Sequence, residues 1–261
     1  MAGQTVDQGL PKTALVTGAV RRIGLAIAER LAAEGYRVAL HCSRASESEA
    51  RVVAARLAAA HGKEKVALVA GDLADPAAPK RLVAEAAAAL GPLTLLVNNA
   101  SIFAADEATT FALDQWERHF AVNLRAPVLL AREFAGQAPA GASIVNIIDQ
   151  RVWRLTPQFF TYTLSKSALW TATCTLAQAL APRQIRVNAV GPGPVLPSDA
   201  QGAKLFALEV AGVPLKQAVE LGDIADAVLY LAAARSVTGQ MIAVDAGQHL
   251  GWETPDVVPN E

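Results

Sequence analysis

A tyrosine and a lysine stand four residues apart, at Tyr162 and Lys166. They fall within residues 157–180, whose length and apolar content predict a helix, so both side chains are expected on one helix face. A phenol has an ordinary pKa of about 10, and a neighbouring ammonium favours the phenolate and lowers that pKa. The pair is therefore predicted to donate a proton to a reacting group and to be recharged afterwards.

Other polar residues are expected near this pair. Asp149 ends a strand predicted over 143–148 and precedes Tyr162 by 13 residues. Asn99, in the sequence Asn-Asn-Ala, ends the preceding strand, and Asn123 lies on the helix between the two. Because the carboxyl ends of parallel strands meet at one side of a sheet, these groups are expected to converge. A Tyr-x-x-x-Lys pair alone is common, whereas its combination with Asn-Asn-Ala and a glycine turn is specific.

A glycine turn follows the first predicted strand, residues 13–17, and contains Gly18 and Gly24. The helix that begins near Ile23 directs its N-terminal N–H groups at this turn, an arrangement that suits a diphosphate. Arg22 opens the helix, where the helix dipole disfavours a cation unless an anion is bound nearby. A plain β–α turn with solvated arginines is the alternative.

The sequence after the second predicted strand favours NADPH over NADH. No acidic residue occurs at positions 35–46, where NAD-type sites carry an acid for the ribose diol. Arg44 can form a fork to a 2′-phosphate, and Ser43 can donate to it. Asp72, after the third strand, is a candidate acceptor for the adenine amine, or alternatively a helix cap or Asx turn.

The order of apolar segments predicts one α/β domain over residues 1–261, a doubly wound Rossmann-type fold. Short apolar strands alternate with helices to the end of the chain, which indicates a parallel sheet covered on both faces. For a doubly wound sheet of this kind we expect the strand order 3-2-1-4-5-6-7. A stretch over 191–221, opened by glycines and prolines, is expected to be a substrate lid. The predicted strands are 13–17, 37–41, 65–70, 93–97, 143–148, 185–190 and 241–245, and the predicted helices are 23–34, 47–61, 76–90, 113–137, 157–180 and 222–234.

Composition narrows the class of protein. Hydrophobic residues make up 52% of 261, and 23 basic residues balance 24 acidic ones, which excludes disorder as the main state and disfavours nucleic acid or a membrane as partners. Two cysteines, the absence of a signal-like start and the absence of a long apolar run favour a cytoplasmic protein. The four histidines lack metal-ligand spacing, so no metal is expected.

Over about residues 12 to 250 the chain resembles the short-chain dehydrogenase/reductase family. The resemblance implies that Tyr162 is the acid, that Lys166 also holds the nicotinamide ribose, and that Asn123 holds a water in a proton relay. The matching pieces are Thr17-Gly18-x-x-x-x-x-Gly24, Asp72, Asn98-Asn99-Ala100, Asn123, Tyr162-x-x-x-Lys166 and Pro192-Gly193.

Two departures from the family pattern are similar to the pteridine reductase branch. Arg22 stands where the family usually has glycine, and Asp149 where it usually has serine. A serine supplies a hydroxyl to a ketone oxygen, whereas a carboxylate coupled to a tyrosine can relay a proton to a pterin nitrogen. In that branch the residues matching Ser101 and Phe103 contact cofactor phosphate and stack on the pterin, respectively.

The predicted activity is NADPH-dependent reduction of a dihydropterin or similar flat C=N heterocycle. The alternatives are a carbonyl reductase acting on a ketone or oxoacyl substrate, and an NADPH-sensing binding protein without turnover. The resemblance also implies a homotetramer joined through helices near 114–137 and 157–181. The residues expected to bind substrate are Arg22, Ser101, Phe103, Asp149 and Tyr162, and those expected to bind cofactor are Gly18, Arg22, Ile23, Gly24, Ser43, Arg44, Asp72, Leu73, Asn99, Ala100, Ser101, Tyr162, Lys166, Pro192 and Gly193.

Overall fold

The computed structural model describes residues 10–197 and 202–252. Its centre is a parallel sheet with the order β3-β2-β1-β4-β5-β6-β7, so the predicted fold class and strand order are confirmed. The strands are β1 (Thr13–Val16), β2 (Arg37–Cys42), β3 (Val66–Ala70), β4 (Leu95–Asn98), β5 (Ser143–Ile147), β6 (Arg186–Pro192) and β7 (Met241–Val244).

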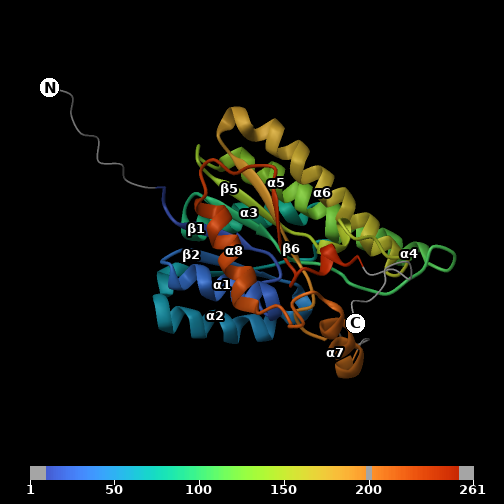
Figure 1. Ribbon diagram of the computed structural model, residues 1–261. Coiled ribbons are helices and arrows are strands. Elements are labelled where there is room, and N and C mark those ends of the chain that lie inside the picture. The colour runs from blue at the N-terminus through green and yellow to red at the C-terminus, as the bar shows by residue number, and fades with distance from the viewer. Residues whose placement is uncertain (1–9, 198–201, 253–261) are drawn as a thin grey trace.

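Helices cover both faces of the sheet (Figure 1). Successive strand side chains point to opposite faces, so Leu15 packs into the core on one face and its neighbour Val16 into the core on the other. The Val16 face is covered by α1 (Arg22–Ala33), α2 (Glu47–His61) and α8 (Leu221–Ala233), and the Leu15 face by α3 (Ala78–Leu90), α5 (Ala126–Gln137) and α6 (Phe160–Leu180).

The helix predicted over 113–137 is interrupted. It consists of α4 (Leu113–Phe120), a π-helical turn over Ala121–Arg125, and then α5. Pro127 occupies the first turn of α5, where its missing N–H costs least, and the irregularity falls just before it. The turn widens the helix at Asn123, and such π-turns recur at functional sites.

The segment expected to be a lid is more regular than predicted. Gly191 and Pro192 complete β6, and α7 (Gly202–Gly212) follows, while residues 198–201 lie outside the described part of the chain. The helix expected from residue 76 begins at Ala78 as α3, with proline at the next position. Among the described residues, none of the helices combines the length and apolar character needed to cross a membrane.

Candidate active site

The carboxyl end of β5 brings the predicted acid, carboxylate and amine together. The Tyr162 hydroxyl donates to Asp149 Oδ2 at 2.9 Å, and the other carboxylate oxygen accepts from the Arg151 amide at 2.8 Å. Lys166 lies one helical turn beyond Tyr162, and its Nζ donates to the Ile147 carbonyl at 2.9 Å. Because Tyr162 and Lys166 are almost fully buried, their polar atoms act in a low-dielectric surrounding.

Burial dominates the electrostatics of this cluster. It raises the pKa of Asp149, and the positive charge of Arg151 partly opposes that rise. The pKa of Tyr162 is raised well above its ordinary value by burial and by the Asp149 charge. Burial lowers the pKa of Lys166 to about 8. The expectation that Lys166 lowers the pKa of Tyr162 is therefore wrong for this structure, in which Tyr162 is a neutral phenol directed at a carboxylate.

Asn123 is fully buried in the π-turn and ties two segments together. Its Oδ1 accepts from the Ile102 amide at 2.8 Å and from Ser101 Oγ at 3.2 Å. Its Nδ2 donates to the Ile102 carbonyl at 3.0 Å and to Ser165 Oγ at 3.1 Å. The side-chain amide thus fixes the loop after β4 against α6, and the water-holding role implied by family resemblance stays a prediction.

The glycine turn is sterically obligatory. Gly18 has a φ of +62°, in the region that favours glycine. A Cβ at Gly24 would stand 2.1 Å from the Gly18 carbonyl oxygen, so no other residue fits there without a backbone shift. Asn99 completes the turn from the neighbouring strand end, since its Nδ2 donates to the Thr17 and Gly18 carbonyls at 2.9 and 3.1 Å.

His41, to which sequence reasoning gave no role, holds the same turn from β2. Its Nδ1 accepts from the Gly18 amide at 3.2 Å, and its Nε2 lies 3.2 Å from the Gly71 carbonyl. The ring is therefore neutral with the proton on Nε2, and burial lowers its pKa to about 4. A polar residue near the end of a buried strand was the only signal for it in the sequence.

The N-terminus of α1 is open to an anion. Its cap residue, Arg21, makes no side-chain cap bond, and no acid occupies the first turn. Arg22 has a φ of +49°, and its guanidinium donates to the Leu196 and Pro197 carbonyls at 3.0 and 3.3 Å. The structure thus brings Arg22 to the segment that follows β6.

The remaining predicted cofactor contacts lie at strand ends. Ser43 and Arg44 follow β2 and are exposed, with Ser43 Oγ 3.0 Å from Ser46 Oγ. Asp72 Oδ1 accepts from the Ala74 amide at 2.9 Å. This contact forms the Asx turn that was predicted as the alternative to a contact with the adenine amine. Gly193, after β6, packs so closely that a Cβ would lie 2.6 Å from Asp245 Cα.

Phe103 belongs to an aromatic stack. Its ring lies parallel to that of Phe159, with centroids 4.3 Å apart, and meets the ring of Tyr162 edge-on at 4.8 Å. The Arg151 guanidinium covers Phe159 at 5.0 Å from its centroid. In the sequence, the only signal for a role of Arg151 was that a basic residue stands two positions after Asp149.

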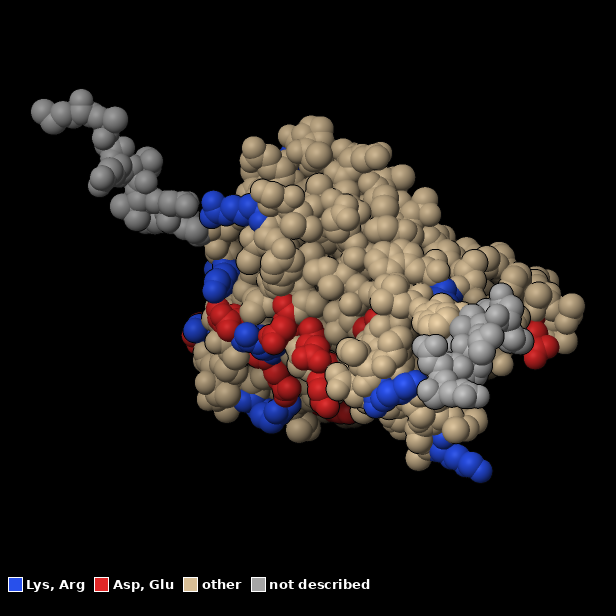
Figure 2. All heavy atoms as spheres, in the orientation of Figure 1, with Lys and Arg blue, Asp and Glu red and all other residues tan. Residues whose placement is uncertain are grey.

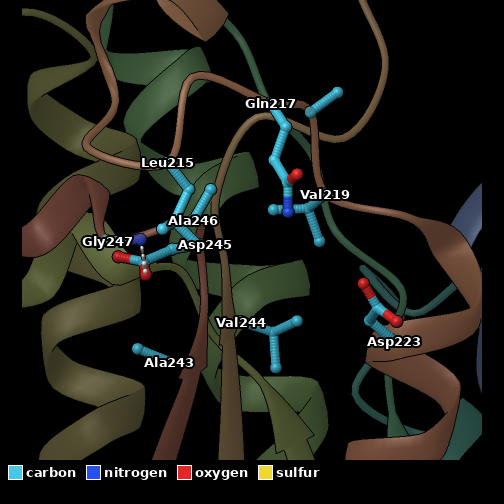
Figure 3. Close-up of a pocket in the computed structure, with 10 residues that line it drawn as sticks. Leu215, Gln217, Val219, Asp223, Ala243, Val244, Asp245, Ala246 and Gly247 are labelled. Atoms are coloured by element: carbon cyan, nitrogen blue, oxygen red, sulfur yellow. Dashed lines mark hydrogen bonds between the residues drawn. The ribbon is translucent and has the colours of Figure 1, made fainter.

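A cavity of about 340 Å³ beside the carboxyl end of β7 is a different feature (Figure 3). Some of the residues that line it, such as Leu215 and Val219, lie in the stretch predicted to be a lid, but among the described lining residues none is a predicted catalytic, cofactor or substrate residue. Its one central acid, Asp245, accepts from the Gly247 amide at 2.9 Å and from His249 Nδ1 at 2.7 Å. The carboxylate is therefore used within the fold, and this cavity is not the candidate active site.

Comparison with known proteins assigns the family. Residues 18–249 match the family model described as enoyl-(acyl carrier protein) reductase. A short-chain type dehydrogenase/reductase of Picea abies is 32% identical over 249 residues, which is 91% of this chain and 92% of that protein.

Two solved structures are more similar still. FolM alternative dihydrofolate reductase 1 from Brucella canis, complexed with NADP, is 50% identical with a TM-score of 0.89, covering 94% of this chain and 97% of that chain. The Brucella suis protein, also with NADP, is 51% identical with the same TM-score, covering 94% and 98%. With the Tyr162–Lys166 pair and the glycine turn in place, these matches lead to one conclusion: the chain belongs to the short-chain dehydrogenase/reductase family.

Proposed function

We propose that this protein is an NADPH-dependent reductase of a dihydropterin-like C=N heterocycle. The observation that carries the proposal is the hydrogen bond from Tyr162 to Asp149, since a carboxylate stands where a ketone reductase needs a hydroxyl donor. The similarity to two alternative dihydrofolate reductases at 50% and 51% identity supports the same substrate class.

The protein's own residues account for the proton. When bound, the nicotinamide supplies a hydride to the carbon of the substrate C=N bond. Asp149 and Tyr162 share a proton, and the pair gives it to the adjoining nitrogen, so that the double bond becomes a single bond with one new C–H and one new N–H. Lys166 holds positive charge beneath the pair, 5.8 Å from the Tyr162 ring centroid. Asp149 is partly exposed, so the pair can take a new proton from solvent.

The geometry of the glycine turn fits a dinucleotide. The absence of a Cβ at Gly18 and Gly24 allows close backbone approach, and the α1 N-terminus is free of a side-chain cap and of acids in its first turn. Arg44 and Ser43, exposed after β2, are the groups proposed to bind a 2′-phosphate. The other proposed cofactor contacts are Arg22, Ile23, Asp72, Leu73, Asn99, Ala100, Ser101, Tyr162, Lys166, Pro192 and Gly193.

The proposed substrate contacts surround Tyr162. Phe103 is 44% exposed and meets Tyr162 edge-on, so its ring is available to stack on a flat heterocycle. Arg22 is exposed beside the segment after β6 and is proposed to bind the carbonyl edge of the substrate. Ser101 adds a hydroxyl near Asn123.

We also propose a cytoplasmic homotetramer joined through α5 and α6. The 21 residues of α6 include one ionisable lysine, Lys166, which is buried. Figure 2 shows charged side chains gathered over α1, α2 and α8, and almost none over α6 in the same view. Light scattering after size exclusion tests the assembly, which has four times the chain mass of 27.2 kDa.

The test of activity is NADPH oxidation by the purified protein with 7,8-dihydropterins and dihydrofolate, beside simple ketones, and with NADH as the cofactor control. Turnover of the pterin with a preference for NADPH supports the proposal. Turnover of ketones alone makes the protein a carbonyl reductase, and NADPH binding without turnover of any substrate makes it a binding protein.

A further inference from the structure

Arg151 lies on the 3-10 turn Gln150–Val152, directly after the proposed proton donor. Its Nη1 donates to Thr156 Oγ1 at 2.7 Å, and its guanidinium carbon lies 5.0 Å from the centroid of the Phe159 ring. Both contacts come from the segment that leads into α6. They hold the side chain against this segment, while the Arg151 backbone amide contacts Asp149.

Among residues 10–197 and 202–252, no carboxylate forms an ion pair with Arg151. Arg21, Arg30 and Arg51 form ion pairs with acids on the surface. Arg151 instead donates to a hydroxyl, and its Nε is buried without a hydrogen-bond partner among the described residues. The charge of Arg151 therefore acts on an acid with which it forms no ion pair among the described residues.

That acid is Asp149, which three polar groups face. The Arg151 amide donates to Oδ1 from the 3-10 turn, the Tyr162 hydroxyl donates to Oδ2 from α6, and the Lys166 ammonium lies behind them on the same helix. Arg151 is the strongest influence that lowers the pKa of Asp149 against burial, and it also lowers the pKa of Tyr162. Arg151 thus acts on both members of the proton-donating pair.

The same side chain contacts the aromatic stack. Phe159 has a φ of +56°, a strained conformation for a non-glycine residue that persists only where the surroundings enforce it. In this conformation the Phe159 ring contacts both the Arg151 guanidinium and the ring of Phe103. Arg151 therefore joins the acid to the proposed stacking residue.

We propose that Arg151 is a positioning residue for proton delivery. Its amide fixes the Asp149 carboxylate against Tyr162, and its guanidinium, held by Thr156 and Phe159, keeps a positive charge beside the acid. The catalytic part of this inference rests on the proposed function, in which Asp149 is part of the proton donor. The electrostatic part does not.

The electrostatic part is tested without substrate. Aspartate carboxyl carbons are labelled with ¹³C and titrated by NMR, and the resonance lost in Asp149→Asn is that of Asp149. In Arg151→Met its midpoint is expected to rise by about one pH unit, as for loss of a cation near a carboxylate. Arg151→Lys, which keeps the charge, should shift it by less than half as much. Arg154→Met, the same change at an exposed neighbour, should leave it in place. An unchanged midpoint in a folded Arg151→Met protein overturns the inference.

The catalytic part is tested by the pH profile of kcat/KM for the substrate that the wild-type protein reduces. The limb on which activity falls with rising pH reports loss of the donated proton, so it should move upward in Arg151→Met and stay in Arg154→Met. A structural loss alone would lower the profile at every pH without moving the limb. A shifted NMR midpoint with an unmoved limb contradicts the role in proton delivery. Absence of turnover in the wild type contradicts the proposed function and leaves the titration result standing.

Discussion

The Tyr162 hydroxyl donates to Asp149 Oδ2 at 2.9 Å, so a buried phenol and a partly exposed carboxylate share one proton. Removing the hydroxyl should remove the last step of proton transfer. We expect Tyr162→Phe to lower kcat by about 10²- to 10⁴-fold, the usual size of a general acid contribution. NADPH binding, followed by the fluorescence of the bound nicotinamide, should persist. Full activity in this variant would show that another group is the acid.

Asp149 distinguishes the two reductase activities. In Asp149→Ser the carboxylate is replaced by the hydroxyl that a ketone needs, so pterin turnover should fall by about 10²-fold or more while ketone turnover is kept or gained. Parallel NADPH-oxidation assays on one dihydropterin and one ketone measure the ratio. Equal losses on both substrates would contradict a substrate-specific role for the carboxylate.

Arg44 is expected to select the cofactor. Arg44→Ala should raise the KM for NADPH by roughly 10- to 100-fold, the value of charge-assisted hydrogen bonds to a phosphate, and should leave the KM for NADH unchanged. Arg51→Ala on α2, another exposed arginine, is the matched control. A parallel rise in both KM values would mean that Arg44 does not contact the 2′-phosphate.

His41 should make stability depend on pH. Its native pKa of about 4 lies below the ordinary value of 6.5, so the unfolded chain takes up the proton first as pH falls. The stabilising contribution is present above pH 6.5 and is lost towards pH 4, about 2 kcal/mol of it between pH 7 and pH 5. Urea unfolding at several pH values measures this slope. The slope should be shallower in His41→Asn. Part of the slope should remain in that variant, because the pKa of His119 is lowered too. Equal slopes would exclude His41 as the cause.

Gly24 in α1 and Gly136 in α5 are both glycines within helices, but the space around them differs. A Cβ at Gly24 meets the Gly18 carbonyl at 2.1 Å, whereas one at Gly136 in α5 meets nothing within 4 Å. Gly136→Ala should stabilise the protein by roughly 0.5–1 kcal/mol through helix propensity. Gly24→Ala should destabilise it and weaken NADPH binding. Thermal unfolding with and without NADPH measures the stability of each variant and its binding of NADPH. If Gly24→Ala changes neither stability nor NADPH binding, the turn relaxes freely.

The features of the fold and the site that depend on local residue patterns could be predicted from the sequence. Apolar runs and glycine punctuation marked the strands of the sheet, and the spacing of Asp149, Tyr162 and Lys166 predicted a cluster that the structure forms. Contacts between segments far apart in the chain were not predictable, because no local pattern encodes them. His41 reaches Gly18 across the strand ends, and Arg22 reaches the segment after β6.

The pKa of Tyr162 escaped prediction for a related reason. The spacing indicates which residues lie near the phenol, but the direction of its pKa shift depends on burial. Burial and Asp149 raise the pKa of Tyr162, and together they outweigh the lowering by Arg151. The left-handed backbone of Phe159 is likewise absent from any propensity, since it is imposed by the packing around it.

The π-turn at Ala121–Arg125 has a consequence for recombining this chain with relatives. A π-turn acts as one extra residue within an α-helix, so residues before and after it are out of register with each other. Deleting one residue between Leu113 and Asn123 would restore ordinary spacing and rotate the asparagine by about 100° away from Ile102. Chimeras should therefore exchange residues 113–137 as one block of unchanged length, and crossover points inside it should yield proteins that fold with a displaced loop after β4.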